Sequence, residues 1–505
     1  MLTFAFVLAT FLSLLKAVKA FPAAKPSILR LPPGPWQLPV IGSIHHLIIA
    51  GSLPYRALHD MSRKYGPLML LKIGETPTVI ASSVEAATEI LKTQDITFSS
   101  RPISVTTNIM SSGGRDMFSA PYSDYWKQIR KVCIMRLFGP KRIQAFKSIQ
   151  EEEAKNLIRS VTTTIEASSP VNLSELITFY FSNITARAIT GTTHKEQLEF
   201  LRVWEKIKRL ASGDNLVDLF PSKRWFTIMV SGATYEAERC HRIVGELLDN
   251  LIMMKRERST ISDATDTEDE DLLDMLLKMD MGEGSELTPL KLDSIKVIIM
   301  NLFGGGSETS VPTIEWAMLE LLRHPSALER AQAEVRSALK GKTTVTMDDV
   351  NELSFIRNVI RETLRLHLPV PLLPRVSKAD CTVLGYDIPK NTKVLVNAWA
   401  LARDPKYWED ADAFKPERFE VQAIDYKGTE LEYMPFSAGC RQCPGRSLGL
   451  ANVELCLANL LYHFDWKFPP GVKPNKLDMS ESFAVTIRRK HQVYLCPVLH
   501  VPSAA

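Results

Sequence analysis

The chain has 505 residues, of which 45% are hydrophobic and 23% charged, and its formal net charge is +4. This length suffices for one large enzyme domain or for two or three ordinary domains, and so slight a charge gives no indication of nucleic-acid binding. The seven cysteines are odd in number and scattered, which argues against a disulfide framework and for a reducing compartment.

An apolar segment opens the chain. Residues 1–15 are apolar apart from three hydroxyl side chains, and Lys16 and Lys19 follow. At about 1.5 Å per residue, an extension to Ala20 gives about 30 Å, enough to span a bilayer core if Lys16 snorkels. No basic residue precedes the run, so the remainder stays in the cytoplasm; a signal peptide cleaved after Ala20 is the alternative. We expect a membrane anchor over 1–20, a proline-rich hinge over 21–38 and a catalytic domain over 39–505.

The next predicted elements are two short strands over 68–73 and 78–80 and a helix over 83–93. Trp126 and Arg130 then stand four residues apart, which places both side chains on one face of a helix. The segment 256–274 is rich in acidic residues but lacks the glycine and spacing of a calcium loop, so a solvated linker is predicted there.

A long helical pattern over 290–323 has an unusual centre. Its three glycines, 304–306, cost about 2–3 kcal/mol of helix stability relative to alanine, which indicates that another group must approach closely. Pro312 cannot donate to the Glu308 carbonyl, which predicts a break in the helix. Asn301, Gly305 and Thr309 fall on one stripe, and we expect this stripe to face a cavity.

A further helix is predicted over 355–367. It carries Glu362 and Arg365, which are three residues apart and can pair. Prolines then enforce an extended, apolar segment from Pro369 to Arg375. Short strands are predicted near Val383, Val394 and Val493.

The segment from Phe436 to Gly445 reads as a tight loop that presents Cys443 at the start of a helix over 448–461. A helix N-terminus favours a thiolate, and Arg441 adds a fixed cation nearby. Cys440 and Cys443 also form a C-x-x-C pair, so a redox or zinc site is the alternative, although no second such pair follows in the sequence.

This loop resembles the haem-binding loop of the cytochrome P450 family, F-x-x-G-x-R-x-C-x-G, at all five fixed positions. The resemblance extends to W-x-x-x-R at Trp126, to [A/G]-G-x-[D/E]-T-[T/S] at 305–310 and to E-x-x-R at Glu362. It covers the chain from the N-terminus to about Cys496 and is strongest with plant microsomal members of specialised metabolism. It implies a mainly α fold with small β-sheets, arranged as a single large haem domain.

The resemblance also implies roles for individual residues. Cys443 would be the axial thiolate ligand of heme b, and Glu308 and Thr309 would carry protons during O2 activation. The residues implied to hold the haem are Trp126, Arg130, Arg375, Phe436, Gly439, Arg441 and Gly445. Glu362, Arg365 and Arg418 are implied to be structural. The implied substrate pocket consists of Asn301, Gly305, Val370, Leu372, Leu373, Phe483 and Ala484.

The expected activity is therefore insertion of one oxygen atom from O2 into a small hydrophobic substrate, with hydroxylation of a terpenoid favoured. No flavin or dinucleotide fingerprint is present, so electrons from NADPH would arrive through a reductase at the endoplasmic reticulum membrane. Lys127, Lys131, Arg136, Lys141 and Arg142 are candidates for docking it. The alternatives are a hydroperoxide isomerase or dehydratase that uses neither O2 nor reductase, and a non-enzymatic haem sensor. Cys440, Gln442 and Pro312 depart from the usual family pattern.

Overall fold

The computed structural model describes residues 29–166, 170–191, 197–211, 215–261, 271–280, 290–421 and 424–500. The predicted anchor over 1–20 and the first part of the hinge lie outside these ranges. Within the ranges, every helix is too short or too polar to cross a bilayer.

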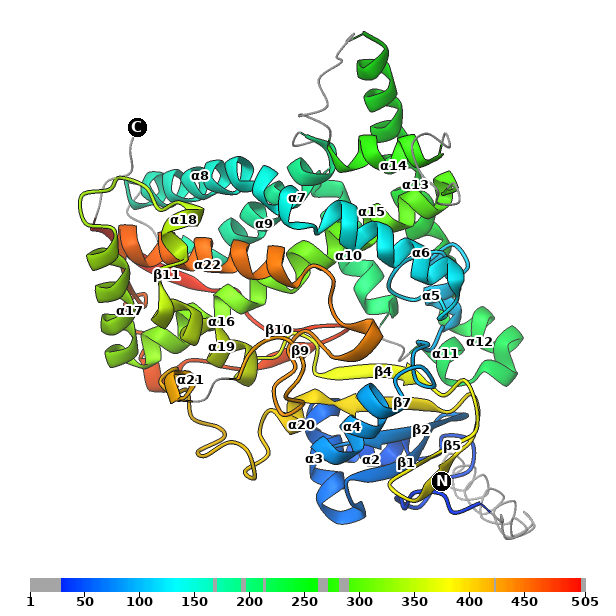
Figure 1. Cartoon of the computed structure of the whole chain (residues 1–505). Coiled ribbons are helices and arrows are strands. Elements are labelled where there is room, and N and C mark those ends of the chain that lie inside the picture. Colours follow the sequence, from blue (N-terminus) through cyan, green and yellow to red (C-terminus); the bar gives the residue numbers. More distant parts are fainter. Residues whose placement is uncertain are drawn as a thin grey trace, which may run out of the picture.

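Helices make up most of the described chain, as expected, and fill all of the molecule except one corner (Figure 1). Short π-helical turns extend α4 and α6 over 89–93 and 133–137. The α-helices are α2 (Ile44–Ala50), α3 (Pro54–Tyr65), α4 (Val84–Thr88), α5 (Val105–Met110), α6 (Asp124–Val132), α7 (Pro140–Ala145), α8 (Lys147–Glu166), α9 (Leu173–Thr190), α10 (Gln197–Ala211), α11 (Leu216–Leu219), α12 (Arg224–Ser231), α13 (Ala233–Ile261), α14 (Leu272–Asp280), α15 (Leu292–Glu308), α16 (Ser310–Arg323), α17 (Pro325–Ala338), α18 (Met347–Val350), α19 (Ser354–Leu366), α20 (Ala398–Leu401), α21 (Arg418–Val421) and α22 (Arg446–His463).

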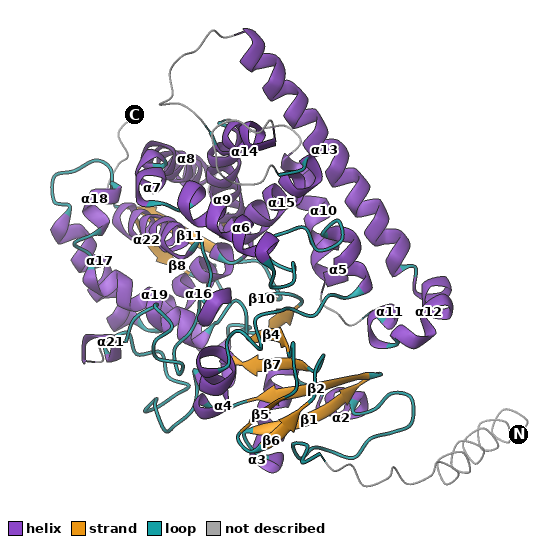
Figure 2. Ribbon diagram, turned by 45° about the vertical axis from the view of Figure 1, so that its right-hand side comes forward, coloured by secondary structure: helices purple, strands orange, loops and turns teal. Residues whose placement is uncertain are grey.

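The strands form small sheets. Among the described residues the largest sheet has the order β1-β2-β7-β4, in which β2 and β7 are parallel and the other neighbours antiparallel. It lies at one corner of the molecule with α2, α3 and α4 (Figures 1 and 2), and α20 packs there against α3 and β4. The strands are β1 (Leu68–Ile73), β2 (Thr76–Ala81), β3 (Val171–Asn172), β4 (Leu372–Val376), β5 (Cys381–Val383), β6 (Tyr386–Ile388), β7 (Lys393–Asn397), β8 (Phe464–Lys467), β9 (Glu481–Phe483), β10 (Ile487–Arg489) and β11 (Tyr494–Leu499).

The helix pair α15 and α16 connects the two largest hydrophobic clusters. One cluster packs α16 with α8, α9, α17, α19 and α22, and the other packs α15 with α5, α6, α10, α13 and α14. The predicted break is present: α15 ends at Glu308, α16 begins at Ser310, and Thr309 between them has φ −93° and ψ −27°. Pro312 lies in the first turn of α16, where its missing N–H costs least.

A buried ion triad fixes α19 against the loop before α21. The Arg365 guanidinium donates to both carboxylate oxygens of Glu362 at 2.8 and 2.9 Å, and Arg418 Nε donates to Glu362 Oε1 at 3.0 Å. Arg365 also donates to the carbonyls of Ala402, Ala411 and Ala413. Because these buried charges are paired and hydrogen-bonded, the triad can be maintained in the interior.

The prediction of a solvated linker over 256–274 was wrong at both ends. Helix α13 continues to Ile261, and α14 begins at Leu272. Lys255 Nζ lies 2.5 Å from Asp271 and 2.9 Å from Asp274, so these two carboxylates are ion-paired and tie the start of α14 to α13. The residues between 261 and 271 lie outside the described ranges.

Candidate active site

The Cys443 loop is positioned by its own backbone and by α4. The Cys443 N–H donates to the Phe436 carbonyl at 2.9 Å, which closes the loop. Gly439 has φ +70° and lies so close to Leu91 that a Cβ would stand 2.5 Å from the Leu91 carbonyl oxygen. The neighbouring Cys440 N–H donates to Asp95 at 2.7 Å. Only glycine fits at position 439, which accounts for this member of the motif.

Cys443 is accessible from outside the chain and is nevertheless enclosed by protein. Its residue surface is exposed, yet burial raises the pKa of its thiol, against the lowering effects of the Gly445 N–H and of Arg130 and Arg446. Both observations are expected for a side chain on the wall of an internal void. α22 starts at Arg446, so the sulfur lies beside a helix N-terminus, as predicted.

The C-x-x-C alternative finds no support in the described part of the chain. Cys440 and Cys443 are both free thiols, and no group of three His, Cys, Asp or Glu side chains gathers there to hold a metal. Burial and Asp95 raise the pKa of Cys440 to about 11, so this thiol stays protonated and unreactive. Gln442 Nε2 donates to the Lys427 carbonyl at 2.6 Å, which gives this departure from the family pattern a local structural partner.

The predicted haem-binding arginines converge beside this void. Arg130 donates to the Gln442 carbonyl at 2.7 Å, and the Arg441 guanidinium lies 4.0 Å from the centre of the Trp126 ring. Trp126 in turn donates to the Met117 carbonyl at 3.0 Å. Arg375 is fully buried and donates to Ser437 Oγ at 3.1 Å. The cluster therefore joins α6, β4 and the Cys443 loop.

Arg101 is a fifth basic or aromatic member that the sequence reasoning missed. Burial and the charges of Arg375 and Arg441 hold the pKa of Arg101 well below its usual value. Burial also lowers the pKa values of Arg375 and Arg441 to about 10. The Nε atoms of Arg101 and Arg375 are buried without a hydrogen-bond partner.

Such a group of buried cations requires an anion to compensate it. A porphyrin with two carboxylates meets this requirement, and the nearby Cys443 supplies the thiolate that its iron requires. The residues present therefore fit a haem.

The stripe on α15 faces open space at its centre. A Cβ on Gly305 would have no atom within 4 Å, and the Thr309 hydroxyl donates to the Gly305 carbonyl at 3.0 Å. Asn301 Oδ1 accepts the Phe118 N–H at 3.2 Å, which draws the loop before α6 against this helix. Phe118 is 49% exposed and was not among the predicted pocket residues.

Glu308 lies on the adjacent stripe and points into an ionic network. Its carboxylate accepts from Lys208 Nζ at 2.9 Å, Trp204 Nε1 at 3.2 Å and Thr486 Oγ1 at 3.1 Å, and it pairs with Arg488. These partners come from α10 and from the hairpin of β9 and β10. The network was not visible in the sequence because its members are more than 90 residues away from Glu308 along the chain.

The apolar residues predicted for the substrate pocket fall into two groups. Val370 and Leu373 pack with the cluster that lines the large sheet. Leu372 and Phe483 pack with Tyr55 and Trp399, and the Phe483 ring centre lies 5.8 Å from that of Tyr55. The Ala484 N–H donates to the Thr486 carbonyl at 3.1 Å in the turn of the hairpin.

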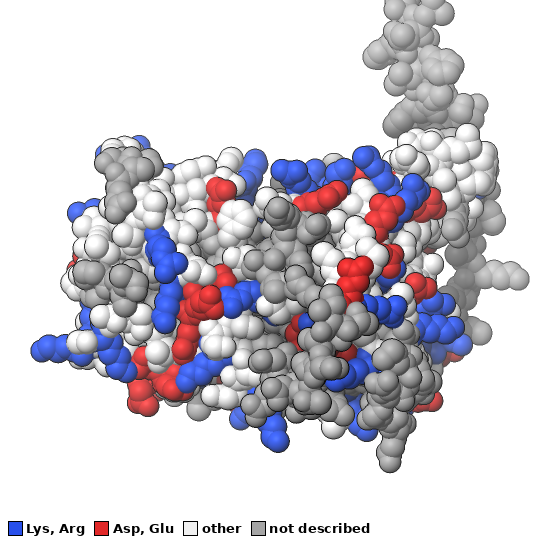
Figure 3. All heavy atoms as spheres, turned by 90° about the horizontal axis from the view of Figure 1, so that it is seen from above, with Lys and Arg blue, Asp and Glu red and all other residues white. Residues whose placement is uncertain are grey.

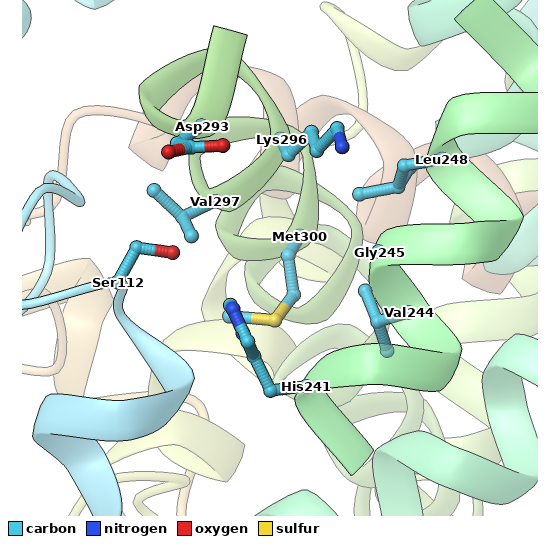
Figure 4. A pocket seen from close by; sticks show the side chains of 9 residues that line it. All are labelled: Ser112, His241, Val244, Gly245, Leu248, Asp293, Lys296, Val297 and Met300. Carbon is cyan, nitrogen blue, oxygen red and sulfur yellow. The ribbon is translucent and has the colours of Figure 1, made fainter. Parts of the chain in front are cut away.

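Two of the cavities between described residues lie along α15, and Cys443 lines neither of these two. The smaller, of about 70 Å³, lies between α13, the N-terminal half of α15 and Ser112, with His241 and Met300 at its base (Figure 4). The larger, of about 230 Å³, is lined by Trp204, Glu205, Glu308, Arg488 and apolar side chains of α10. Only the larger cavity shares a residue with the predicted site.

Comparison with known proteins identifies the fold and the family. The family model described as Cytochrome P450 matches residues 32–495. The chain is 45% identical to desmethyl-deoxy-podophyllotoxin synthase of Sinopodophyllum hexandrum, over 93% of this chain and 92% of that protein. It is 44% identical to germacrene A hydroxylase of Barnadesia spinosa, over 93% and 92%, and 44% identical to amorpha-4,11-diene 12-monooxygenase of Artemisia annua, over 92% of each.

A solved structure of a zebra fish cytochrome P450 with progesterone superposes with a TM-score of 0.72 at 25% identity, covering 88% of this chain and 100% of that one. The mainly helical fold agrees with these matches. The chain belongs to the cytochrome P450 family of monooxygenases.

Proposed function

We propose that this protein hydroxylates a terpenoid, using O2 and electrons that NADPH supplies through a reductase. The observation that carries the proposal is the open space at Gly305, between Asn301 and Thr309 on one stripe of α15, which leaves room for an apolar molecule. Relatives that are 42–44% identical over most of their length are named for germacrene A, amorpha-4,11-diene and premnaspirodiene.

In this proposal the side chains bind, orient and move protons. Cys443 holds the iron, and Arg101, Arg130, Arg375 and Arg441 neutralise the porphyrin carboxylates. The bound haem supplies the oxygen activation. The Thr309 hydroxyl borders the open space and relays protons into it. Glu308, whose carboxylate is paired with Lys208 and Arg488, borders the cavity of about 230 Å³ and takes up, then releases toward Thr309, each proton that solvent in this cavity delivers.

The reductase is proposed to dock near α6. Lys131 and Lys141 are exposed there, and Lys127 has a half-exposed side chain. Arg130 connects this helix to the Cys443 loop through Gln442, so that a partner on α6 lies close to the haem. On the face seen in Figure 3, Lys and Arg alternate with Asp and Glu, and no single sign dominates.

We also propose attachment to the endoplasmic reticulum membrane. Apart from the predicted anchor, the support comes from exposed apolar side chains of α2 and α12, which lie at one end of the folded molecule. Ile48 and Ile49 of α2 are 72% and 78% exposed, and Met229 and Val230 of α12 are 78% and 58% exposed. Such a concentration of apolar surface is typical of a protein or membrane contact.

The test is conversion of a panel of terpene hydrocarbons by the full chain with a plant reductase and NADPH. The panel should include germacrene A, amorpha-4,11-diene and premnaspirodiene. We expect an alcohol whose oxygen carries the label of isotopic O2, and none when NADPH or reductase is omitted. Turnover without NADPH and reductase, with no oxygen taken up from labelled O2, would instead indicate an isomerase or dehydratase.

A further inference from the structure

A histidine at the end of α19 lies between two buried carboxylates from different elements. His367 Nε2 is 2.8 Å from Glu320 Oε1 of α16, and His367 Nδ1 is 3.9 Å from Glu481 Oε1 of β9. The three side chains are only 11%, 5% and 3% exposed. The imidazole also stacks on the Trp316 ring, with centres 4.0 Å apart and planes 4° apart. α16 and α19 thus hold this ring in one orientation.

The other side of the Glu481 carboxylate is held by α3. The Tyr55 hydroxyl and Arg56 Nη2 both donate to Glu481 Oε2 at 2.5 Å. Burial alone would raise the pKa of Glu481, but His367, Tyr55 and Arg56 together lower it to about 2. Glu481 is therefore a permanent anion whose position is set by three partners, of which His367 comes from the helical core.

Glu481 begins the hairpin that carries two predicted substrate contacts. β9 and β10 pair in the register Glu481–Arg489, Ser482–Arg488 and Phe483–Ile487, with the turn at Ala484 between them. The Ile487 N–H donates to the carbonyl of Pro369, two residues after His367, at 2.8 Å. On the far side of the turn, Thr486 donates to Glu308 of α15 at 3.1 Å. The hairpin is thus hydrogen-bonded on one side to the segment that follows α19 and on the other side to Glu308, the last residue of α15.

We propose that His367 is a positioning residue for substrate selectivity. Its imidazole Nδ1, 3.9 Å from Glu481 Oε1, positions the strand that leads to the Phe483–Ala484 turn, and three residues after His367 the chain enters the predicted pocket segment at Val370. A single imidazole therefore positions two walls of the substrate pocket, the Phe483–Ala484 turn and the segment from Val370, without touching the substrate. The inference rests on the proposed function only in assigning those walls to the pocket.

The test compares a small and a bulky iron ligand in the haem-loaded full chain. Unsubstituted imidazole is small enough to bind the iron without contacting the pocket walls, whereas the three phenyl rings of 1-tritylimidazole must pack against those walls. In His367→Gln and in Glu481→Gln we expect the affinity for 1-tritylimidazole to change about tenfold while that for imidazole stays within about twofold. The double variant should change no more than Glu481→Gln alone, because His367 acts on the hairpin only through Glu481.

His324→Gln is the matched control. His324 also faces Glu320, at 3.5 Å, but it follows the end of α16 and packs on Phe414 rather than on the hairpin. It should leave both affinities unchanged. All variants should retain the spectrum of a thiolate-ligated haem after reduction in the presence of carbon monoxide. If His367→Gln does not retain its haem, the comparison of the two ligands is made with Glu481→Gln alone.

Equal changes for both ligands, no change for either, or multiplicative effects in the double variant would overturn the proposal. The spectral titration needs no substrate, so it remains decisive even if no terpene is oxidised and the proposed function fails. Where a substrate is oxidised, a changed ratio of its hydroxylated products in His367→Gln, but not in His324→Gln, is the corresponding readout in turnover.

Discussion

At the scale of single residues, the site is defined by buried positive charges that form no ion pair within the described part of the chain. Arg375 and Arg441 are 0% and 4% exposed, and Arg441 is satisfied by the carbonyls of Ser99 and Ala120 rather than by a carboxylate. A carbonyl satisfies a donor but does not neutralise a charge. The chain alone therefore carries an electrostatic penalty that a dianionic ligand removes.

Arg101 should contribute to haem retention. Replacing it by methionine keeps much of its volume but removes a charge whose Nε has no partner in the protein. A charge-assisted contact is worth about 1.5–3 kcal/mol, so we expect haem loss to apomyoglobin to accelerate roughly 10- to 100-fold in Arg101→Met. Arg115→Met, which removes a half-exposed arginine paired with Asp293, is the control. Equal haem-loss rates in the two variants would contradict the assignment.

Glu481 should make stability depend on pH in the acid range. Its pKa lies at about 2 in the folded chain against an ordinary 4.5, so the charged form stabilises the fold at neutral pH. That stabilisation, on the order of 3 kcal/mol, is lost as the pH falls from about 4.5 to about 2. The denaturant midpoint of Glu481→Gln should therefore lie well below wild type at pH 7, and the gap should narrow below pH 4.5. The exposed Glu417→Gln should show no gap at any pH.

At the scale of elements, α15 uses neighbouring glycines for different purposes. A Cβ on Gly304 would stand 1.9 Å from the Trp204 ring, whereas one on Gly305 would meet nothing within 4 Å. Gly304 is thus required by helix packing, and Gly305 leaves the cavity open. Substitutions at the two glycines should therefore affect different properties, namely stability at Gly304 and ligand binding at Gly305.

Gly304→Ala should destabilise the protein, because the methyl group displaces Trp204 and weakens its hydrogen bond to Glu308. Overpacking of this kind costs about 1–3 kcal/mol. Gly305→Ala should instead raise stability by up to about 1 kcal/mol through helix propensity and reduce the affinity for 1-tritylimidazole. Thermal unfolding and spectral titration of both variants provide the measurement. A stability loss in Gly305→Ala as large as in Gly304→Ala would show that both glycines serve packing.

Local patterns predicted the elements that depend on local physics. The glycines and Pro312 predicted a break near the centre of the 290–323 helix, which the structure places at Thr309, and the spacing of Trp126 and Arg130 placed both on one face of α6. Arg101 and the partners of Glu308 could not be found this way, because no periodicity links a residue to a contact more than 90 positions away. The acidic run near Asp271 was misread for a different reason: its counterion, Lys255, lies 16 positions earlier on the preceding helix, so the run by itself looks unpaired.

At the scale of the whole molecule, the exposed apolar side chains of α2 and α12 lie at the same end of the molecule, because a chain of contacts joins these two helices. Ser222, just before α12, donates to the Glu75 carboxylate at 2.8 Å, and the Glu75 N–H donates to the Leu219 carbonyl at 3.0 Å. These contacts join α11 and α12 to the turn between β1 and β2, and Gly42 bridges that turn to the start of α2. Figures 1 and 2 both show α11 and α12 beside the outer end of this sheet.

This end should bind lipid independently of the N-terminal segment. In a variant lacking residues 1–28, Ile48→Ser with Ile49→Ser, or Met229→Ser with Val230→Ser, removes apolar area worth about 25 cal/mol per Å². Each pair should therefore lower partitioning onto phospholipid vesicles about tenfold or more in sedimentation. Val421→Ser is the control, because this side chain is 88% exposed but lies on α21, away from α2 and α12. If all three variants partition equally, the exposed apolar end takes no part in membrane contact, and attachment depends on residues 1–28 alone.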